Sequence, residues 1–193
     1  DRPGLADIAK ALRPTRVRVM LGASLLVFLG STLLFFFMKD FGAHLGLANV
    51  GLFFTVSTGA TIAVRAVGSG LLDRVEKRRL LCLALLALAA CQGAYSLVRS
   101  PAAFLAVAAG FGACMGIALP LVQSLIFLMA DPGKRGLTAN LSLSTMDAGY
   151  VLGPYLGAMV LAAGFSHAAL FGLAAGMTLG ACALVAFSAP KST

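Results

Sequence analysis

Residues 131–164 read DPGKRGLTANLSLSTMDAGYVLGPYLGAMVLAAG and decide the fold class. A charged turn opens the stretch, and about 27 nearly uncharged residues follow, enough for one helix to cross a hydrocarbon layer of about 30 Å. One acidic residue, Asp147, lies inside this span. Three glycines and a proline follow it: Gly149, Gly153, Pro154 and Gly157. An apolar segment with a carboxyl group and a face of small residues is costly in lipid unless it packs on other helices or borders a wet cavity. The stretch therefore predicts one helix of a membrane bundle.

The composition of the whole chain also indicates a membrane protein. Of its 193 residues, 60% are hydrophobic and only 11% are charged, and the mean hydropathy is +0.95. A soluble domain needs far more charge to cover its surface, so a soluble globular class is excluded. The four cysteines lie in apolar runs without CxxC spacing, which favours buried thiols over a metal site or a disulfide. We expect no metal and no cofactor.

Six apolar runs, each of about 18 residues or more, predict six membrane-spanning helices in an all-α fold. Their expected bounds are about Val17–Met38, Val50–Ser69, Leu80–Val98, Ala102–Met129, Leu137–Ala163 and Ala168–Phe187. Local signals agree with these bounds, because Ser100 and Pro101 are typical of a helix start, Gly164 of a helix end and Ser166 of an N-cap.

The predicted bundle occupies residues 17–188, between a polar cytoplasmic linker at residues 1–16 and a cytoplasmic tail at residues 189–193. In the linker, Leu5, Ile8 and Leu12 share one helical face, which suits a short helix on the membrane surface. A frayed linker is an equally good interpretation of so short a segment.

The loops differ strongly in their content of Lys and Arg, which predicts the orientation. Of the 15 Lys and Arg residues, 12 fall in segments on one side of the predicted topology, and only Lys39 and Arg99 fall on the other. Arg65 lies inside the second span. Because positive loops stay in the cytoplasm, we expect both termini to be cytoplasmic. The net charge of +8 thus indicates topology and contact with a lipid bilayer, and we infer no nucleic-acid partner from it.

Polar residues on the fifth predicted span form one stripe. Asn140, Ser144 and Asp147 are spaced by four and three residues, so they share a helical face that we expect to border a cavity. Asp147 is the sole acidic residue within the spans, and it is a candidate for binding and releasing a proton. A structural role, with the acid hydrogen-bonded to a neighbouring helix, stays open. Gln123 on the fourth span is a second polar candidate.

Two glycine series predict close helix packing. On the fifth span these are Gly149, Gly153 and Gly157, and on the sixth they are Gly172, Gly176 and Gly180. Pro154 interrupts the hydrogen-bond ladder of the fifth helix, which would let that helix bend.

Residues 65–79 read RAVGSGLLDRVEKRR and carry a resemblance to a known family. The segment is similar to the basic loop signature of the major facilitator superfamily, G-x-L-x-D-R-x-G-R-[RK]. The matching positions are Leu71, Asp73, Arg74 and Arg78, with Lys77 as a conservative replacement. Ser69 and Glu76 replace the two glycines, as expected for the degenerate copy in the second half of such a transporter. The fifth span also resembles the eleventh helix of that family.

The resemblance implies that the chain is the carboxyl-terminal six-helix half of a twelve-helix transporter, built from two inverted three-helix repeats. The substrate would lie between this half and a missing amino-terminal half, with the first and fourth spans lining the cavity and the second and fifth meeting the other half. The implied lining and proton-coupling residues are Ser24, Ser31, Thr32, Gln123, Asn140, Ser144 and Asp147. The implied cytoplasmic gate consists of Arg65, Asp73, Arg74, Lys77 and Arg78.

The expected function is secondary active transport in a cell membrane, most simply a bacterial inner membrane, with proton-coupled efflux of a small amphiphilic solute. The mostly apolar lining favours such a solute over a sugar or phosphate. The alternative is a stand-alone six-helix subunit without transport activity. An enzyme is not expected, because an intramembrane serine protease needs a G-x-S-G turn and a membrane-embedded His, whereas Ser24 lies in LGASL and His44 and His167 lie in loops.

Overall fold

The computed structural model describes residues 4–72 and 75–188, and within them the chain is all-helical. The elements in order are α1 (Leu5–Ala11), α2 (Thr15–His44), α3 (Leu52–Leu72), α4 (Lys77–Ala94), the 3-10 turn η1 (Tyr95–Leu97), α5 (Pro101–Met129), the 3-10 turn η2 (Pro132–Lys134), α6 (Arg135–Ala162) and α7 (His167–Phe187). Each of the six predicted spans corresponds to one long helix. The largest deviation is at α2, which continues past the expected end at Met38 to His44.

Four of the described helices are long and apolar enough to cross a membrane by length and composition: α2, α4 with η1, α5 and α7. The apolar part of α3 is shorter and covers Leu52–Gly68. The 28-residue α6 is long enough but carries the polar residues of the stripe. Helices that border a cavity or another protein surface tolerate such polar groups, whereas helices surrounded by lipid do not.

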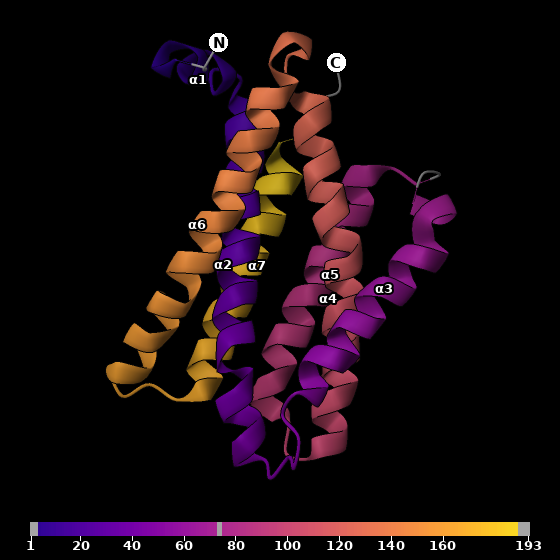
Figure 1. The fold of residues 1–193 in the computed structure, drawn as a ribbon, viewed down its shortest axis with the longest axis vertical. Helices are drawn as coiled ribbons and strands as arrows, with labels where there is room; N and C mark the ends of the chain where they lie inside the picture. Colours follow the sequence, from indigo (N-terminus) through magenta and orange to yellow (C-terminus); the bar gives the residue numbers. More distant parts are fainter. Residues whose placement is uncertain (1–3, 73–74, 189–193) are drawn as a thin grey trace.

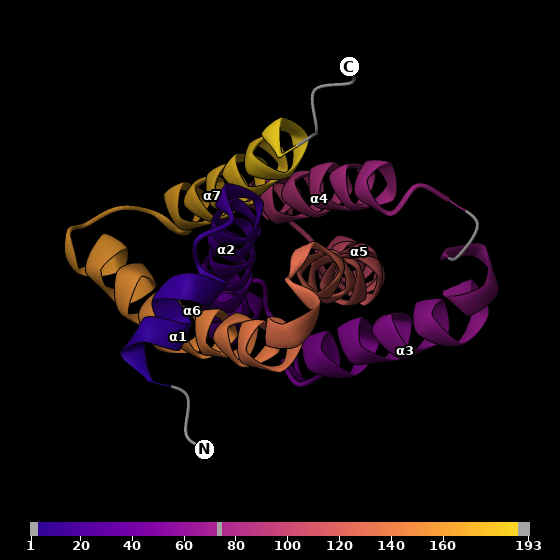
Figure 2. The same cartoon turned by 90° about the horizontal axis from the view of Figure 1, so that it is seen from above.

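Figures 1 and 2 show how the long helices pack. α2 lies between α6 and α7, α5 lies between α3 and α4, and α4 packs along α7. Exchanging α2, α3 and α4 for α5, α6 and α7 turns the α2–α6 pair into α5–α3 and the α2–α7 pair into α5–α4, and it leaves the α4–α7 pair unchanged. The chain therefore consists of two three-helix repeats. Because each repeat crosses the bundle three times, the second repeat begins at the opposite end from the first, so the repeats are inverted.

The ends of α5, α6 and α7 are set by local sequence signals. The Ser100 hydroxyl accepts a hydrogen bond from the Ala103 amide at 3.3 Å and begins α5, and the Ser166 hydroxyl accepts one from the Ala169 amide at 3.4 Å and begins α7. Gly164, with φ of +85°, ends α6 in a conformation that other residues rarely adopt. These three ends agree with the sequence prediction.

A cluster of aromatic rings closes the end of the bundle opposite α1. Phe53, Tyr95, Phe104 and Phe171 are fully buried there and come from α3, η1, α5 and α7. Phe41 of α2 joins them, with its ring centroid 4.8 Å from that of Phe171 in an edge-to-face arrangement. Such pairs contribute about 0.5–1.5 kcal/mol each beyond the burial of their area. The cluster ties both repeats together at this end.

Candidate functional site

A cavity of about 150 Å³ lies between α2 and α6 on one side and α3 and α5 on the other. Its walls carry aromatic and aliphatic side chains together with small hydroxyl groups. The lining residues are Phe28, Ser31, Thr32, Phe35, Ser57, Thr58, Thr61, Phe111, Gly112, Met115, Leu119 and Tyr150. The cavity is open on one side.

On the α2–α6 side, a threonine and two glycines hold the helices at close range. The Thr32 hydroxyl lies 2.7 Å from the Phe28 carbonyl of its own helix and 2.8 Å from the Gly149 carbonyl of α6, and it shares its proton between them. A Cβ atom on Gly149 would lie 2.5 Å from the Phe28 Cβ, and one on Gly153 would lie 3.0 Å from the Leu29 carbonyl. No larger residue fits either position without moving α6 away from α2.

The same arrangement of a threonine and two glycines occurs on the α3–α5 side. The Thr61 hydroxyl lies 2.9 Å from the Ser57 carbonyl of its own helix and 2.7 Å from the Gly112 carbonyl of α5. A Cβ atom on Gly112 would lie 2.7 Å from the Ser57 Cα, and one on Gly116 would lie 3.1 Å from the Thr61 carbonyl. Our sequence reasoning did not single out Thr61, Gly112 or Gly116. The small-x-x-x-small spacing of the two glycines was the signal that could have found them.

The predicted lining residues of α2 and α5 divide into two groups. Ser31 and Thr32 line the cavity, and the Ser31 hydroxyl donates to the Met115 sulfur at 3.4 Å. Ser24 instead accepts a hydrogen bond from Thr145 at 3.1 Å. The Gln123 side-chain oxygen accepts one from the Ser142 hydroxyl of α6 at 2.9 Å. Ser24 therefore joins α2 to α6, Gln123 joins α5 to α6, and neither residue lines the cavity.

The polar stripe of α6 lies outside the cavity. Asn140, Ser144 and Asp147 are exposed, on the side of α6 opposite the buried glycines that face α2. The Ser144 hydroxyl donates to the Asn140 carbonyl at 3.1 Å. Asp147 precedes Tyr150, a cavity residue, by three positions, about one turn of α6.

The glycine series of α7 does not mediate close packing within the described residues. A Cβ atom on Gly172 or Gly176 would meet open space, and one on Gly180 would make ordinary van der Waals contact with Leu26 at 3.5 Å. The close approach between α2 and α7 occurs instead at Gly30, where a Cβ atom would lie 2.8 Å from the Ala174 carbonyl. The expectation for Gly172 and Gly176 is therefore corrected, because their face of α7 points away from α2 and α4.

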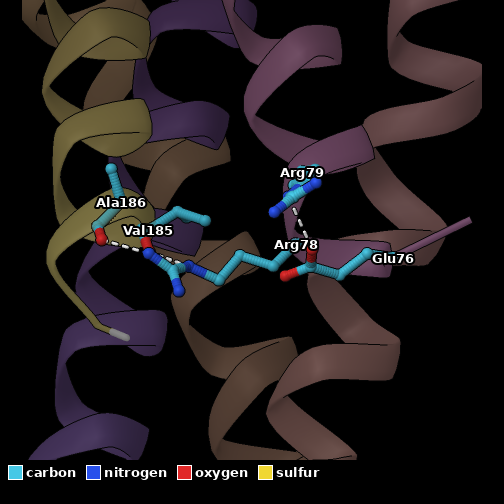
Figure 3. Close-up of polar contacts among 5 residues, drawn as sticks. All are labelled: Glu76, Arg78, Arg79, Val185 and Ala186. Atoms are coloured by element: carbon cyan, nitrogen blue, oxygen red, sulfur yellow. Dashed lines mark hydrogen bonds and ion pairs between the residues drawn. The ribbon is translucent and has the colours of Figure 1, made fainter. Parts of the chain in front are cut away.

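The basic loop is partly described. Asp73 and Arg74 lie outside the described residues. Figure 3 shows Arg78 reaching from the start of α4 to the end of α7, where its Nε donates to the Val185 carbonyl at 3.0 Å and its Nη2 donates to the Ala186 carbonyl. A cation at these carbonyls also complements the helix dipole of α7.

Three other cations in or near this loop each make one polar contact. Lys77 donates to the Ser124 hydroxyl at 3.2 Å, and Arg79 forms an exposed ion pair with Glu76 at 2.7 Å. Arg65 is exposed on α3, and its Nε lies 3.4 Å from the Gly116 carbonyl of α5. In the described part of the loop, Arg78 and Lys77 both join helices from different repeats, Arg78 through two carbonyls of α7 and Lys77 through one hydroxyl of α5.

Comparison with protein-family models finds one described as Major Facilitator Superfamily, which matches residues 20–193. The match runs from the first turns of α2 to the end of the chain and includes both three-helix repeats. Comparison with curated proteins finds no match.

Proposed function

The chain belongs to the major facilitator superfamily of membrane transporters, and on this basis we propose that it forms the carboxyl-terminal half of a secondary active transporter. The observation that supports a half-transporter is the cavity between α2, α3, α5 and α6, which is open on one side. Transporters of this architecture hold their substrate between two six-helix bundles near the midplane and alternate access by rocking one bundle against the other. A second bundle, preceding this one, would close the open side.

The lining favours a small amphiphilic solute. Phe28, Phe35, Phe111 and Tyr150 provide aromatic surface, and threonine and serine hydroxyls provide a few hydrogen-bonding groups. No Lys, Arg, Asp or Glu is among the residues that line the cavity. A highly charged solute would lose its hydration without a compensating charge, whereas an apolar body with one or two polar groups would match this surface.

The half-transporter proposal is tested by reconstitution. Proteoliposomes with this chain alone should move no solute, whereas those that also hold a preceding six-helix half should release amphiphilic solutes down an imposed proton gradient. Thr58→Trp, which narrows the cavity, should slow that release, and Ala158→Trp on the exposed outer side of α6 should leave it unchanged. Transport by the chain alone, as a monomer, would refute the proposal, and the absence of transport in both preparations would favour a subunit without transport activity.

Proton coupling is proposed for Asp147. It is the acidic residue of α6, it is exposed, and it lies one turn from Tyr150 at the open side of the cavity. A carboxylate in that position is costly next to lipid or an apolar partner surface unless it is solvated or protonated, so its protonation state should follow the side to which the cavity opens. Efflux by exchange for protons would follow from that coupling.

The test of Asp147 separates coupling from binding. Asp147→Asn should abolish net transport driven by a proton gradient while leaving solute exchange measurable, because Asn mimics the protonated state permanently. Ser144→Ala on the same stripe serves as the matched control and should retain both activities. Full gradient-driven transport by Asp147→Asn would assign the residue a structural role.

The loop between α3 and α4 is proposed as a cytoplasmic gate, with Asp73 docking on a helix start in the preceding half. This orientation, with both termini in the cytoplasm of a bacterial inner membrane, rests on the distribution of Lys and Arg. It agrees with the arrangement in Figure 1, in which α1 and the α5–α6 connection lie at the same end of the bundle.

A further inference from the structure

The end of the bundle that carries α1 has a separate hollow of about 420 Å³, at the corner between α1, the start of α2 and the α5–α6 connection. Its lining residues are Lys10, Arg13, Pro14, Asp131 and Lys134. Three cations and one carboxylate leave two uncompensated positive charges. Among the residues that the structure describes, none of the three cations forms an ion pair. Such a concave cluster of cations attracts an anion.

An apolar groove of about 330 Å³ lies between α2 and α6. Leu21, Gly22 and Leu25 line it from α2, and Leu141, Thr145 and Ala148 are among the residues that line it from α6. Leu12, directly before Arg13, lines its end next to α1. The exposed surface of the groove is almost entirely hydrocarbon.

The cationic hollow and the groove adjoin at Leu12 and Arg13, consecutive residues that line the groove and the hollow, and we call the two together the furrow. From Pro14 in the hollow, the α2 wall continues to Leu21 and Leu25 in the groove, at spacings of seven and four residues that keep one helical face. Lys134, the N-cap residue of α6, lines the hollow, and Leu141 and Thr145 follow on α6 at the same spacings. Seven residues advance a helix by about 10 Å, so the charged part lies roughly one headgroup layer above the apolar part.

We propose that this furrow binds an anionic phospholipid. Lys10, Arg13 and Lys134 hold its phosphate, and one acyl chain lies in the groove between α2 and α6. The ligand has to combine negative charge with a hydrocarbon chain, because the two features occur in the order in which a phospholipid presents them across a membrane surface. A free phosphate would leave the groove unused, and a zwitterionic lipid would not compensate the net positive charge.

The lipid would also position α1. In Figures 1 and 2, α1 lies across the end of α6, and Ala11 is buried while Lys10 and Arg13 are exposed. A headgroup held between α1 and the α5–α6 connection would therefore fix the linker against the bundle. This site depends on the membrane-embedded fold and not on the identity of the transported solute.

Lipid binding is measured on the purified full chain in neutral detergent, with bound lipid counted by native mass spectrometry. The chain is titrated with phosphatidylglycerol and with phosphatidylcholine of the same acyl chains. The unmodified chain should prefer phosphatidylglycerol. Lys10→Gln with Lys134→Gln should weaken phosphatidylglycerol binding by about 25-fold, since each cation near a headgroup contributes a factor of about five. The matched control, Arg16→Gln with Arg79→Gln, removes the same charge from the same end and should change binding less than about fivefold.

A second pair of variants tests the groove. Ala148→Phe should weaken the binding of long-chain phosphatidylglycerol but not of its dihexanoyl form, whereas Ala158→Phe on the outer side of α6 should affect neither. Equal losses in the two charge variants would show a diffuse surface effect and overturn the proposal. Equal binding of both lipid classes, or competition by millimolar inorganic phosphate as effective as that by lipid, would also overturn it. Circular dichroism verifies the fold of each variant. If the double variant unfolds, Lys10→Gln alone is tested, and it should weaken phosphatidylglycerol binding by about fivefold.

Discussion

Gly112→Ala is expected to push α3 away from α5. In the structure, the position that the new Cβ atom would occupy lies 2.7 Å from the Ser57 Cα and overlaps the Ser57 carbonyl. Both contacts are with backbone, so no side-chain rotation relieves them. Because nonbonded carbon atoms prefer separations of about 3.5–4.0 Å, the helices must separate by about 1 Å. That movement also lengthens the hydrogen bond from the Thr61 hydroxyl to the Gly112 carbonyl, now 2.7 Å.

The expected magnitude combines three effects on the free energy of unfolding. Overpacking costs about 1–3 kcal/mol. The weakened interhelical hydrogen bond costs about 0.6 kcal/mol, a typical value within membranes. Alanine has a higher helix propensity than glycine, which offsets up to about 1 kcal/mol. The net loss is about 2 kcal/mol.

Unfolding is followed by circular dichroism as SDS is added to the chain in mixed micelles. Gly172→Ala is the matched control, because a Cβ atom there meets open space. It should unfold at the same SDS fraction as the unmodified chain or at a higher one. Thr61→Val removes the hydrogen bond without overpacking and should cost only about 0.6 kcal/mol. The packing argument fails if Gly112→Ala is as stable as the unmodified chain, or if Gly172→Ala is destabilised equally.

Two further outcomes are expected. Arg78→Gln should lower the free energy of unfolding by about 2 kcal/mol, because it removes charged hydrogen bonds to the last turn of α7. The control Arg79→Gln loses only an exposed ion pair and should change the free energy of unfolding by less than about 1 kcal/mol. Equal losses by the two variants in the same SDS titration would contradict this role of Arg78. In a chain without its natural cysteines, a membrane-impermeant thiol reagent should label His44→Cys from outside and Lys134→Cys from the cytoplasm, and the reverse pattern would invert the topology.

The number and order of the helices could be predicted from the sequence, because an apolar run that spans a bilayer has few alternatives to a helix. Helix ends could also be predicted where a specific residue sets them, as at Ser100 and Gly164. The end of α2 could not be predicted in this way, because Lys39 and Asp40 end the apolar run without breaking the helix. An apolar run indicates which residues lie within the lipid, whereas a helix ends only where its backbone hydrogen bonding ends.

The candidate site was less predictable, because spacing identifies a helical face but not its neighbour. Gly149 and Gly172 both belong to series spaced by four residues, yet Gly149 packs against Phe28 while Gly172 meets open space. Likewise, Ser24 and Ser31 are seven residues apart on α2, but one bonds to Thr145 and the other lines the cavity. These differences depend on which helices meet, and that is decided by contacts between residues far apart in the chain.

The pairing of helices across the two repeats has a consequence for how the chain is made. α2 is synthesised before α6, yet its hydrogen bond from Thr32 to Gly149 joins residues 117 positions apart. Its described contacts with the next helix, α3, include Phe35 with Phe54, at a centroid distance of 4.7 Å, near the connecting loop. The hydroxyls of Ser24 and Thr32 therefore enter the bilayer without their final partners on α6. Insertion of the first repeat into the membrane must therefore precede its packing against α6 and α7, which are synthesised later.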